Sequence, residues 1–392
     1  MTEEAPAAAR VPLAVIARQW ARLGILGFGG PPAHIALLRK LVVDDRGWLP
    51  EQEFEDGVAA VNLLPGPAST QLTIYCAWRL RGAAGALVGG ACFILPGLVV
   101  ILCLASVFLA EHPPGWIAGA ALGAGSAVPA VAVAAAVGLI PASWRRMGEA
   151  RSARARWICY LLAGGAAAAV VGPWLVLVLV GCGLIEAGVR SRPWHRPGSQ
   201  PGAMLAPLAV GAAGISGGLA ALAWVAFKVG ALSFGGGFVI IPLMQHDAVD
   251  TYHWMTAGQF LTAVALGQVT PGPVVQTVAV LGYAAAGIGG GLLASLVAFT
   301  PSFCFVLGGG RYFDRLRRSD AVQAFLAGAG PAAIGAIAGA AIPLLLALAH
   351  LWQVAVLAAA VGWLIGLRRG VVPAIVGAAG LGVLTYLAGG PV

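Results

Sequence analysis

Hydrophobic residues follow one another along the chain in long uncharged runs, and polar residues are confined to the short segments between them. Two runs, Ala83–Ala110 and Trp116–Ser143, contain no charged residue and exceed the ~20 residues that a helix needs to cross a hydrocarbon core about 30 Å thick. Of 392 residues, 59% are hydrophobic and 10% are charged, against roughly 25% charged in soluble domains. We therefore expect an all-α polytopic membrane protein with no separate soluble domain.

One hydrophobic region is interrupted by NLLPGPASTQ at 62–71. Pro65 and Pro67 remove two backbone amide donors, and Pro67 suits the first turn of a following helix. Basic loops flank the region on both sides, so the segment 57–78 is expected to enter the membrane, break at Gly66 and return as a second half-helix. Free amides after such a break are tolerated only where they line a protein cavity, so the pattern predicts a bound polar ligand.

The chain repeats itself. RLGILGFGG at 22–30 matches KVGALSFGG at 228–236, and the offset between their phenylalanines is 234 − 28 = 206. The same offset pairs NLLPGP at 62–67 with QVTPGP at 268–273, so the break occurs twice. The chain is accordingly divided into a first repeat at 11–189, a basic linker at 190–216 that has room for an extra membrane segment, and a second repeat at 217–392.

The cations indicate that the two repeats are inverted. In the first repeat they lie in the loops 39–46, 79–81 and 145–156. The equivalent segments 245–253 and 285–289 carry no Lys or Arg, whereas 311–320 carries four Arg. Cytoplasmic loops concentrate Lys and Arg, so opposite orientations explain both patterns and most of the net charge of +8. The first helix of each repeat either crosses the membrane or is re-entrant, and the second route needs 204–224 as an extra crossing.

Both breaks would place helix N-termini inside the membrane. Such an end behaves like about half a positive charge and offers unpaired amides, which suits an anion. The expected substrate-binding residues at the breaks are Asn62, Pro65, Gly66, Pro67, Ser69, Thr70 and Gln71 in the first repeat, and Gln268, Thr270, Pro271, Gly272, Pro273 and Gln276 in the second. A kink without a ligand is the alternative for one copy, and duplication at a fixed offset favours a site.

The first helix of each repeat ends in a glycine cluster. Gly29 and Gly30, with Gly235 and Gly236 in the second repeat, would allow unwinding and approach of a ligand to the backbone, and tight helix packing is the alternative.

Four ionisable residues stand out in the hydrophobic regions. Arg22 and Lys228 occupy equivalent positions, since 28 − 22 and 234 − 228 are both 6, and they would either coordinate the anion or extend to the membrane surface. His34 and Asp56 occur in the first repeat alone, and each is a candidate for proton handling or for a structural role. No metal-ligand spacing or nucleotide-binding motif is present, so neither a metal nor a cofactor is expected.

The motifs FGGPPAH, NLLPGPASTQL, FKVGALSFGGGF, GQVTPGP and AFTPSF, in this order over about residues 20–310, resemble the two-domain form of the chromate ion transporter family. The resemblance implies a membrane transporter that lowers cytoplasmic chromate by means of two homologous domains of opposite topology.

We therefore predict a secondary transporter, and not an enzyme, that exports chromate across the plasma membrane and confers chromate resistance. Chromate and sulfate share charge and shape, so a sulfate-type oxyanion permease is the alternative within this class. An intramembrane enzyme is an alternative from another class, but it would have to rely on His34, Asp56 and Glu186. Besides the oxyanion and the bilayer, no nucleic-acid partner is expected. A homodimer is compatible with the sequence, and the C-terminus is expected on the non-cytoplasmic side.

Overall fold

The structure is a computed structural model, and it describes residues 11–62, 64–110, 112–147, 150–171, 175–190, 218–233, 238–309 and 319–391. Within these ranges the regular structure is entirely helical. Four helical segments are long and apolar enough to cross a membrane: Ala68–Phe108, Gly115–Arg146, Val274–Gly309 and Asp320–Leu346. The prediction of an all-α polytopic membrane protein is confirmed.

The helices of the first repeat are α1 (Leu13–Leu26), α2 (Pro31–Arg39), α3 (Glu51–Val61), α4 (Ala68–Phe108), α5 (Gly115–Arg146), α6 (Arg151–Ala166) and α7 (Leu175–Arg190). Those of the second repeat are α8 (Leu219–Leu232), α9 (Ile241–Gln245), α10 (Ala257–Val269), α11 (Thr277–Gly309), α13 (Asp320–Gly339), α14 (Ala341–Leu346), α15 (Leu351–Val361) and α16 (Val371–Leu387). A π-helical turn follows α2 as η1 (Lys40–Asp45) and α9 as η5 (His246–Thr251), and the 3₁₀ turn η6 (Val274–Gln276) precedes α11.

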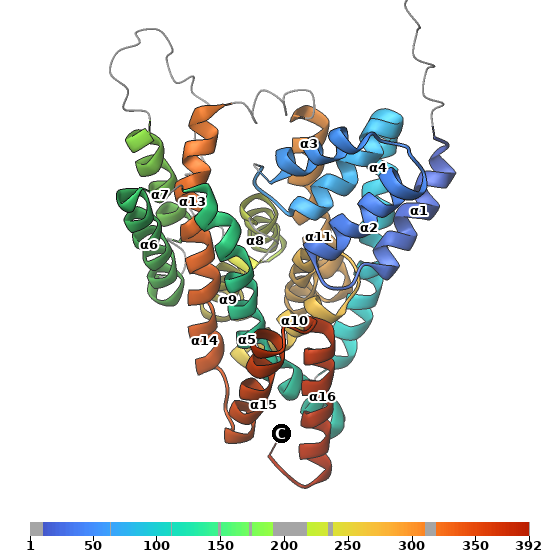
Figure 1. Cartoon of the computed structure of the whole chain (residues 1–392). Helices are drawn as coiled ribbons and strands as arrows, with labels where there is room; N and C mark the ends of the chain where they lie inside the picture. The colour runs from blue at the N-terminus through green and yellow to red at the C-terminus, as the bar shows by residue number, and fades with distance from the viewer. Residues whose placement is uncertain are drawn as a thin grey trace, which may run out of the picture.

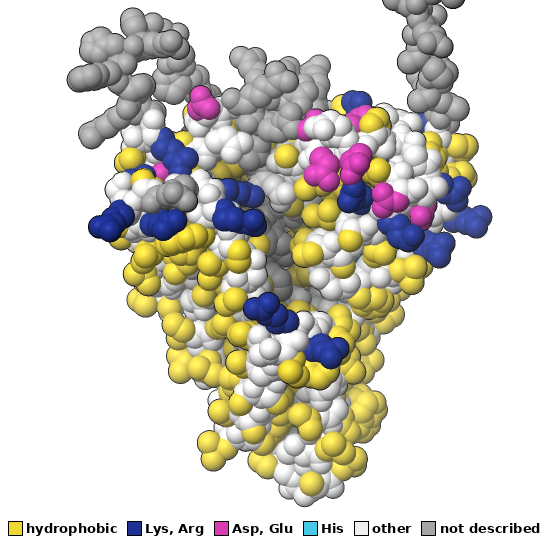
Figure 2. Space-filling model, viewed as in Figure 1, with side chains coloured by type: hydrophobic (Ala, Val, Ile, Leu, Met, Phe, Trp, Pro, Cys, Tyr) yellow, Lys and Arg dark blue, Asp and Glu magenta, His cyan; other side chains and the backbone are white. Residues whose placement is uncertain are grey.

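The molecule is a wedge with a broad end that carries α3, α7 and the start of α13, and a narrow end formed by α15 and α16 (Figure 1). Most charged side chains on the visible face gather at the broad end, and the flanks and the narrow end are largely hydrophobic (Figure 2). A protein of this kind presents its apolar flanks to lipid and its charged end to water.

The backbone repeats closely between the two halves. Within α4 the chain leaves helical geometry at Arg81 (φ −148°, ψ 23°) and Gly82 (φ 61°, ψ −152°). Within α11 it does the same at Ala286 (φ −154°, ψ 34°) and Gly287 (φ 61°, ψ −155°). Glycine tolerates the positive φ that this reversal needs. The segments before and after Gly82 pack side by side, since a Cβ at Gly89 would meet the side chain of Ala77 at 2.5 Å. Each of α4 and α11 is therefore a returning half-helix followed by a full crossing.

The two halves run in opposite directions and exchange their last helices. In Figure 1, α5 runs from the narrow end to the broad end, whereas α13 runs from the broad end to the narrow end. The α6–α7 pair packs on α13 of the second repeat, and the α15–α16 pair packs on α5 of the first. Glycines permit both contacts: Gly123 abuts the backbone of Ala378, and Gly328 abuts that of Cys182. The inverted, re-entrant architecture is thus built as an interlocked pair of repeats.

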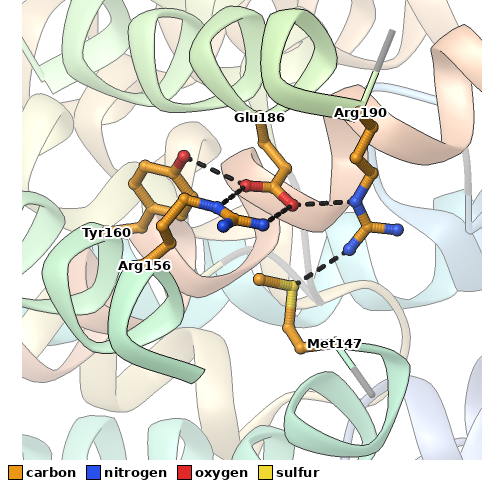
Figure 3. A network of polar contacts seen from close by, with 5 residues as sticks. All are labelled: Met147, Arg156, Tyr160, Glu186 and Arg190. Carbon is orange, nitrogen blue, oxygen red and sulfur yellow. Dashed lines mark hydrogen bonds and ion pairs between the residues drawn. The ribbon is translucent and has the colours of Figure 1, made fainter. Parts of the chain in front are cut away.

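A buried carboxylate fastens the α6–α7 pair (Figure 3). Glu186 has a fully buried side chain and accepts hydrogen bonds from Arg156 Nε at 2.7 Å, Arg190 Nε at 2.8 Å and Tyr160 Oη at 3.1 Å. Arg190 also donates to the sulfur of Met147 at 3.3 Å, which ties the end of α5 to the network. The carboxylate oxygens are occupied by charge-assisted bonds, as in a structural ion pair.

Candidate functional site

Each of the two breaks lies at the interface between the repeats. The backbone amide of Gly66 donates to the carbonyl oxygen of Ser233 at 2.9 Å, and the amide of Gly272 donates to that of Gly27 at 2.9 Å. These bonds are repeat equivalents, since 272 − 66 and 233 − 27 are both 206. Each break is therefore capped by the C-terminal end of the first helix of the other repeat, where orphan carbonyls are available.

Glycine is required at the centre of each break because the backbone is left-handed there. Gly66 has φ 118° and Gly272 has φ 92°, a region that costs other residues about 1–2 kcal/mol. The flanking prolines fix the approach to each bend, and the half-helix that follows starts at Ala68 in one repeat and at η6 in the other. Both sequence-predicted breaks, including Pro65, Pro67, Pro271 and Pro273, are present as unwound segments.

The glycine cluster of the first repeat adopts the expected break. Gly29 (φ 98°) and Gly30 (φ 76°) separate α1 from α2, and Pro31 begins α2. Close packing is carried by a different glycine of the motif: a Cβ at Gly24 would lie 2.5 Å from the carbonyl oxygen of Phe93 in α4. Gly235 and Gly236 of the second repeat lie outside the described residues.

The elements that form the breaks carry several buried polar side chains. Buried side-chain atoms with no hydrogen-bond partner among the described residues include Thr70 Oγ1, Gln71 Oε1, Ser233 Oγ, Gln268 Nε2, Gln276 Oε1 and Ser302 Oγ. The amide nitrogens of the two glutamines that follow the breaks are occupied, since Gln71 donates to Pro65 O and Gln276 to Ile94 O, each at 2.6 Å. Buried polar groups are costly unless they are paired, so this cluster is suited to hold water or a polar ligand.

Two other predicted break residues bond within their own helices. Thr270 Oγ1 donates to Leu266 O at 2.9 Å, and Asn62 Nδ2 donates to Val58 O at 2.8 Å. The side chain of Asn62 is exposed, whereas its repeat equivalent Gln268 is buried.

His34 connects the two breaks. Its side chain is 3% exposed, and its Nε2 donates to Gly27 O at 2.9 Å while its Nδ1 lies 3.3 Å from Ser69 Oγ. Gly27 O also accepts the Gly272 amide, so a chain of hydrogen bonds runs from Ser69 in the first half-helix to the second break. Asp56, the other candidate for proton handling, accepts from Gln52 Nε2 at 3.3 Å, one turn away in α3.

The two equivalent cations have different surroundings. Arg22 is exposed on α1. Lys228 is partly buried on α8, and its Nζ lies 2.7 Å from Oδ2 of Asp247 in η5. Sequence reasoning missed Asp247. The repeat offset aligns Asp247 with Leu41, so matching the two repeats does not single it out. The signal that could have found it is Lys228 itself, because a cation in a hydrophobic helix needs a nearby carboxylate as counter-ion.

An open cavity of about 940 Å³ lies against the loops of the first repeat. Its lining includes Trp48, Glu53, Trp78, Arg79 and Arg81, and none of the break residues. The breaks themselves are closed, since Thr70, Gln71 and Gln276 have no exposed surface. No group of His, Cys, Asp and Glu that could hold a metal ion occurs within the part of the chain that the structure describes.

Comparison with known proteins decides the family. The family model described as chromate transporter matches two regions, residues 14–187 and 220–384, which together cover most of the chain. The chain belongs to the chromate transporter family. It is 32% identical over 334 residues to the chromate transport protein of Cupriavidus metallidurans, covering 82% of this chain and 80% of that protein. It is 30% identical to the probable chromate transport protein of Synechococcus elongatus, with 82% of each chain covered.

A third relative of this chromate transporter family member matches over a similar share of both chains. The chromate transport protein of Pseudomonas aeruginosa is 29% identical over 346 residues, covering 82% of this chain and 79% of that protein. No solved structure matches the chain. The two regions of the family match flank the segment that links the repeats, which confirms the two-domain form.

Proposed function

We propose that this chain is a secondary transporter that binds chromate beside the two breaks, exports it from the cytoplasm and confers chromate resistance. One observation carries the proposal: in a member of the chromate transporter family, each of two inverted half-helix breaks is hydrogen-bonded to the first helix of the other repeat, and buried hydroxyl and amide groups beside the breaks have no hydrogen-bond partner among the described residues.

The half-helix ends supply the attraction for an anion. The amides at the start of α4 and of η6 lie at helix N-termini, so each end contributes about half a positive charge. The hydroxyls of Ser69, Thr70 and Ser302 can donate hydrogen bonds, and Gln268 offers an amide nitrogen. Lys228 carries an ammonium, which pairs with Asp247 in this structure. The Gly66 and Gly272 amides are occupied, so these glycines shape the site and leave the contacts to their neighbours.

Alternating access would follow from the interlocked repeats. In the closed state of the structure the substrate groups are buried, and the α6–α7 and α15–α16 pairs each pack on the opposite repeat. Rocking of one repeat against the other around a fixed central site would expose it to either side, as in other inverted-repeat transporters. We place the charged broad end in the cytoplasm, the protein in the plasma membrane and the C-terminus on the non-cytoplasmic side.

Transport assays test this function. The protein is reconstituted in proteoliposomes, and chromate movement is followed under imposed proton and anion gradients, with sulfate as competitor. We expect gradient-dependent chromate flux that excess sulfate reduces only in part. Flux of sulfate without flux of chromate would instead support a sulfate-type permease, and conversion of a substrate by detergent-purified protein would support an enzyme.

A further inference from the structure

The ion pair of Lys228 with Asp247, in the second repeat, has no counterpart at the equivalent positions 22 and 41 of the first repeat, where Arg22 and Leu41 stand. Lys228 is the sole charged residue of α8, and its ammonium is 2.7 Å from Asp247 Oδ2, with side-chain exposures of 18% and 8%. The ammonium also lies 5.9 Å from the ring centroid of Trp224, one turn earlier. Ion pairs inside a membrane protein are costly to bury, so they usually mark a substrate or ion pathway.

The repeat itself shows that the pair is not needed to shape the backbone. Leu41 replaces Asp247 in the first repeat, since 247 − 206 = 41, yet η1 and η5 form the same π-helical turn. Both turns close with the same bond, Trp48 N to Val42 O and Trp254 N to Ala248 O, each at 2.8 Å. The first repeat thus reaches this fold with no carboxylate at that position.

Lys228 belongs to the helix that caps the first break. The carbonyl oxygen of Ser233, at the end of α8, accepts the Gly66 amide, and the carbonyl oxygen of Gly230 lies 3.4 Å from the position of a Cβ on Gly66. Lys228 precedes Gly230 by two residues, a rise of about 3 Å along a helix. The backbone of Lys228 therefore lies within one helical turn of the residue that packs against the first break, and Asp247 pairs with its ammonium.

We propose that Asp247 is the internal counter-anion of Lys228, that the transported oxyanion competes with it for the ammonium, and that Asp247 takes up a proton from the aqueous phase when the oxyanion displaces it. This inference rests on the proposed function. Lys228 would turn from Asp247 to the anion, and the carboxylate left behind would be a buried unpaired charge, which protonation neutralises.

Among the described residues, the one cation besides Lys228 that faces Asp247 is a histidine when it is protonated. The ionisable groups that face it are Lys228, His246 and Tyr252. His246 is engaged with Asp250, with Nδ1 at 3.3 Å from Oδ2. The two α-helices packed against η5, α9 and α10, contribute no titratable side chain. A proton is thus the available replacement for the lost ion pair.

The test measures chromate binding by equilibrium dialysis, and flux in proteoliposomes, as a function of pH. Asp247→Asn should bind chromate about tenfold more tightly than wild type, because the competitor is gone, and its binding should lose the pH dependence of wild type. Lys228→Gln should bind at least tenfold more weakly. Since Lys228→Gln leaves a buried carboxylate and can misfold, the double variant K228Q/D247N is measured beside it and should remain folded but bind weakly.

A pair of exposed residues provides the control. Lys40 and Asp45 form an ion pair at 3.1 Å in the equivalent loop of the first repeat, and K40Q/D45N should behave as wild type. Wild-type affinity in K228Q/D247N, or unchanged affinity and pH dependence in Asp247→Asn, would overturn the exchange. If the wild type binds sulfate but not chromate, the chromate function is wrong, and the competition between the anion and Asp247 is then tested by measuring sulfate binding in the same variants. Binding of neither anion would overturn both.

Discussion

The amide of Gly272 donates a 2.9 Å hydrogen bond to the carbonyl oxygen of Gly27, although the two residues belong to different repeats. Its equivalent joins Gly66 to Ser233 at the same distance. Each repeat therefore supplies the carbonyl oxygen that accepts the central amide of the other repeat's break. The proposed substrate groups lie around this pair of bonds.

Gly272→Ala tests the break through backbone conformation alone. A Cβ there would meet no atom closer than 3.7 Å, but φ is 92°, so alanine should pull the amide away from Gly27 O at a cost of about 1–2 kcal/mol. We expect chromate affinity to fall about tenfold, with normal amounts of protein in the membrane. The control is Gly258→Ala, at the start of α10, where a Cβ meets nothing within 4 Å and φ is not positive.

The inverted topology predicts which loops share a side. Cysteines that replace Arg146 at the end of α5 and Ser319 at the start of α13 should both be shielded from impermeant external thiol reagents in intact cells. A cysteine at Tyr252, beside η5, should react. Permeabilised cells supply the control, since all three sites should then be modified. Labelling of positions 319 and 252 from the same side would contradict the inversion.

Arg22 and Lys228 are equivalent in sequence but should differ in effect. Arg22 is exposed, and exposed charges contribute about 0–1 kcal/mol, so Arg22→Gln should change the apparent chromate affinity by no more than about fivefold. Lys228→Gln, measured in the D247N background to avoid an unpaired carboxylate, should weaken it about tenfold or more. Equally large losses of chromate affinity in both variants would instead show that Arg22 and Lys228 both coordinate the anion, as their equivalent positions in the sequence suggest.

Glu186→Gln should reduce stability and leave chromate binding intact. The change removes the buried charge that pairs with Arg156 and Arg190. Since those two guanidiniums are 28% and 37% exposed and keep contact with water, the loss is about 1–3 kcal/mol. Thermal unfolding of the detergent-purified variant should shift to lower temperature, while the dissociation constant for chromate at low temperature stays within about twofold of wild type. The matched substitution Glu55→Gln, at an exposed position of α3, should leave both quantities unchanged. Loss of binding in a folded Glu186→Gln protein would assign the network to the transport path.

The sequence by itself determined the class of fold and the position of the breaks. Long uncharged segments cannot be stable outside a membrane, and inside it their backbone must be helical. Pro65-Gly66-Pro67 and its copy at 271–273 cannot continue a helix whatever surrounds them, because proline lacks the amide and glycine tolerates positive φ. These are local constraints, so the repeat was visible without coordinates.

Only the tertiary structure decided what each break meets. The sequence placed Arg22 and Lys228 in equivalent positions, but the surroundings of a side chain depend on segments that pack against it from elsewhere in the chain. Asp247 of η5 pairs with Lys228 of α8, whereas Arg22 is exposed. The bonds from Gly66 to Ser233 and from Gly272 to Gly27 span 233 − 66 = 167 and 272 − 27 = 245 residues. These two hydrogen bonds form because the repeats interlock. Hydrophobic periodicity reports on local structure and carries no information about contacts between residues so far apart in the sequence.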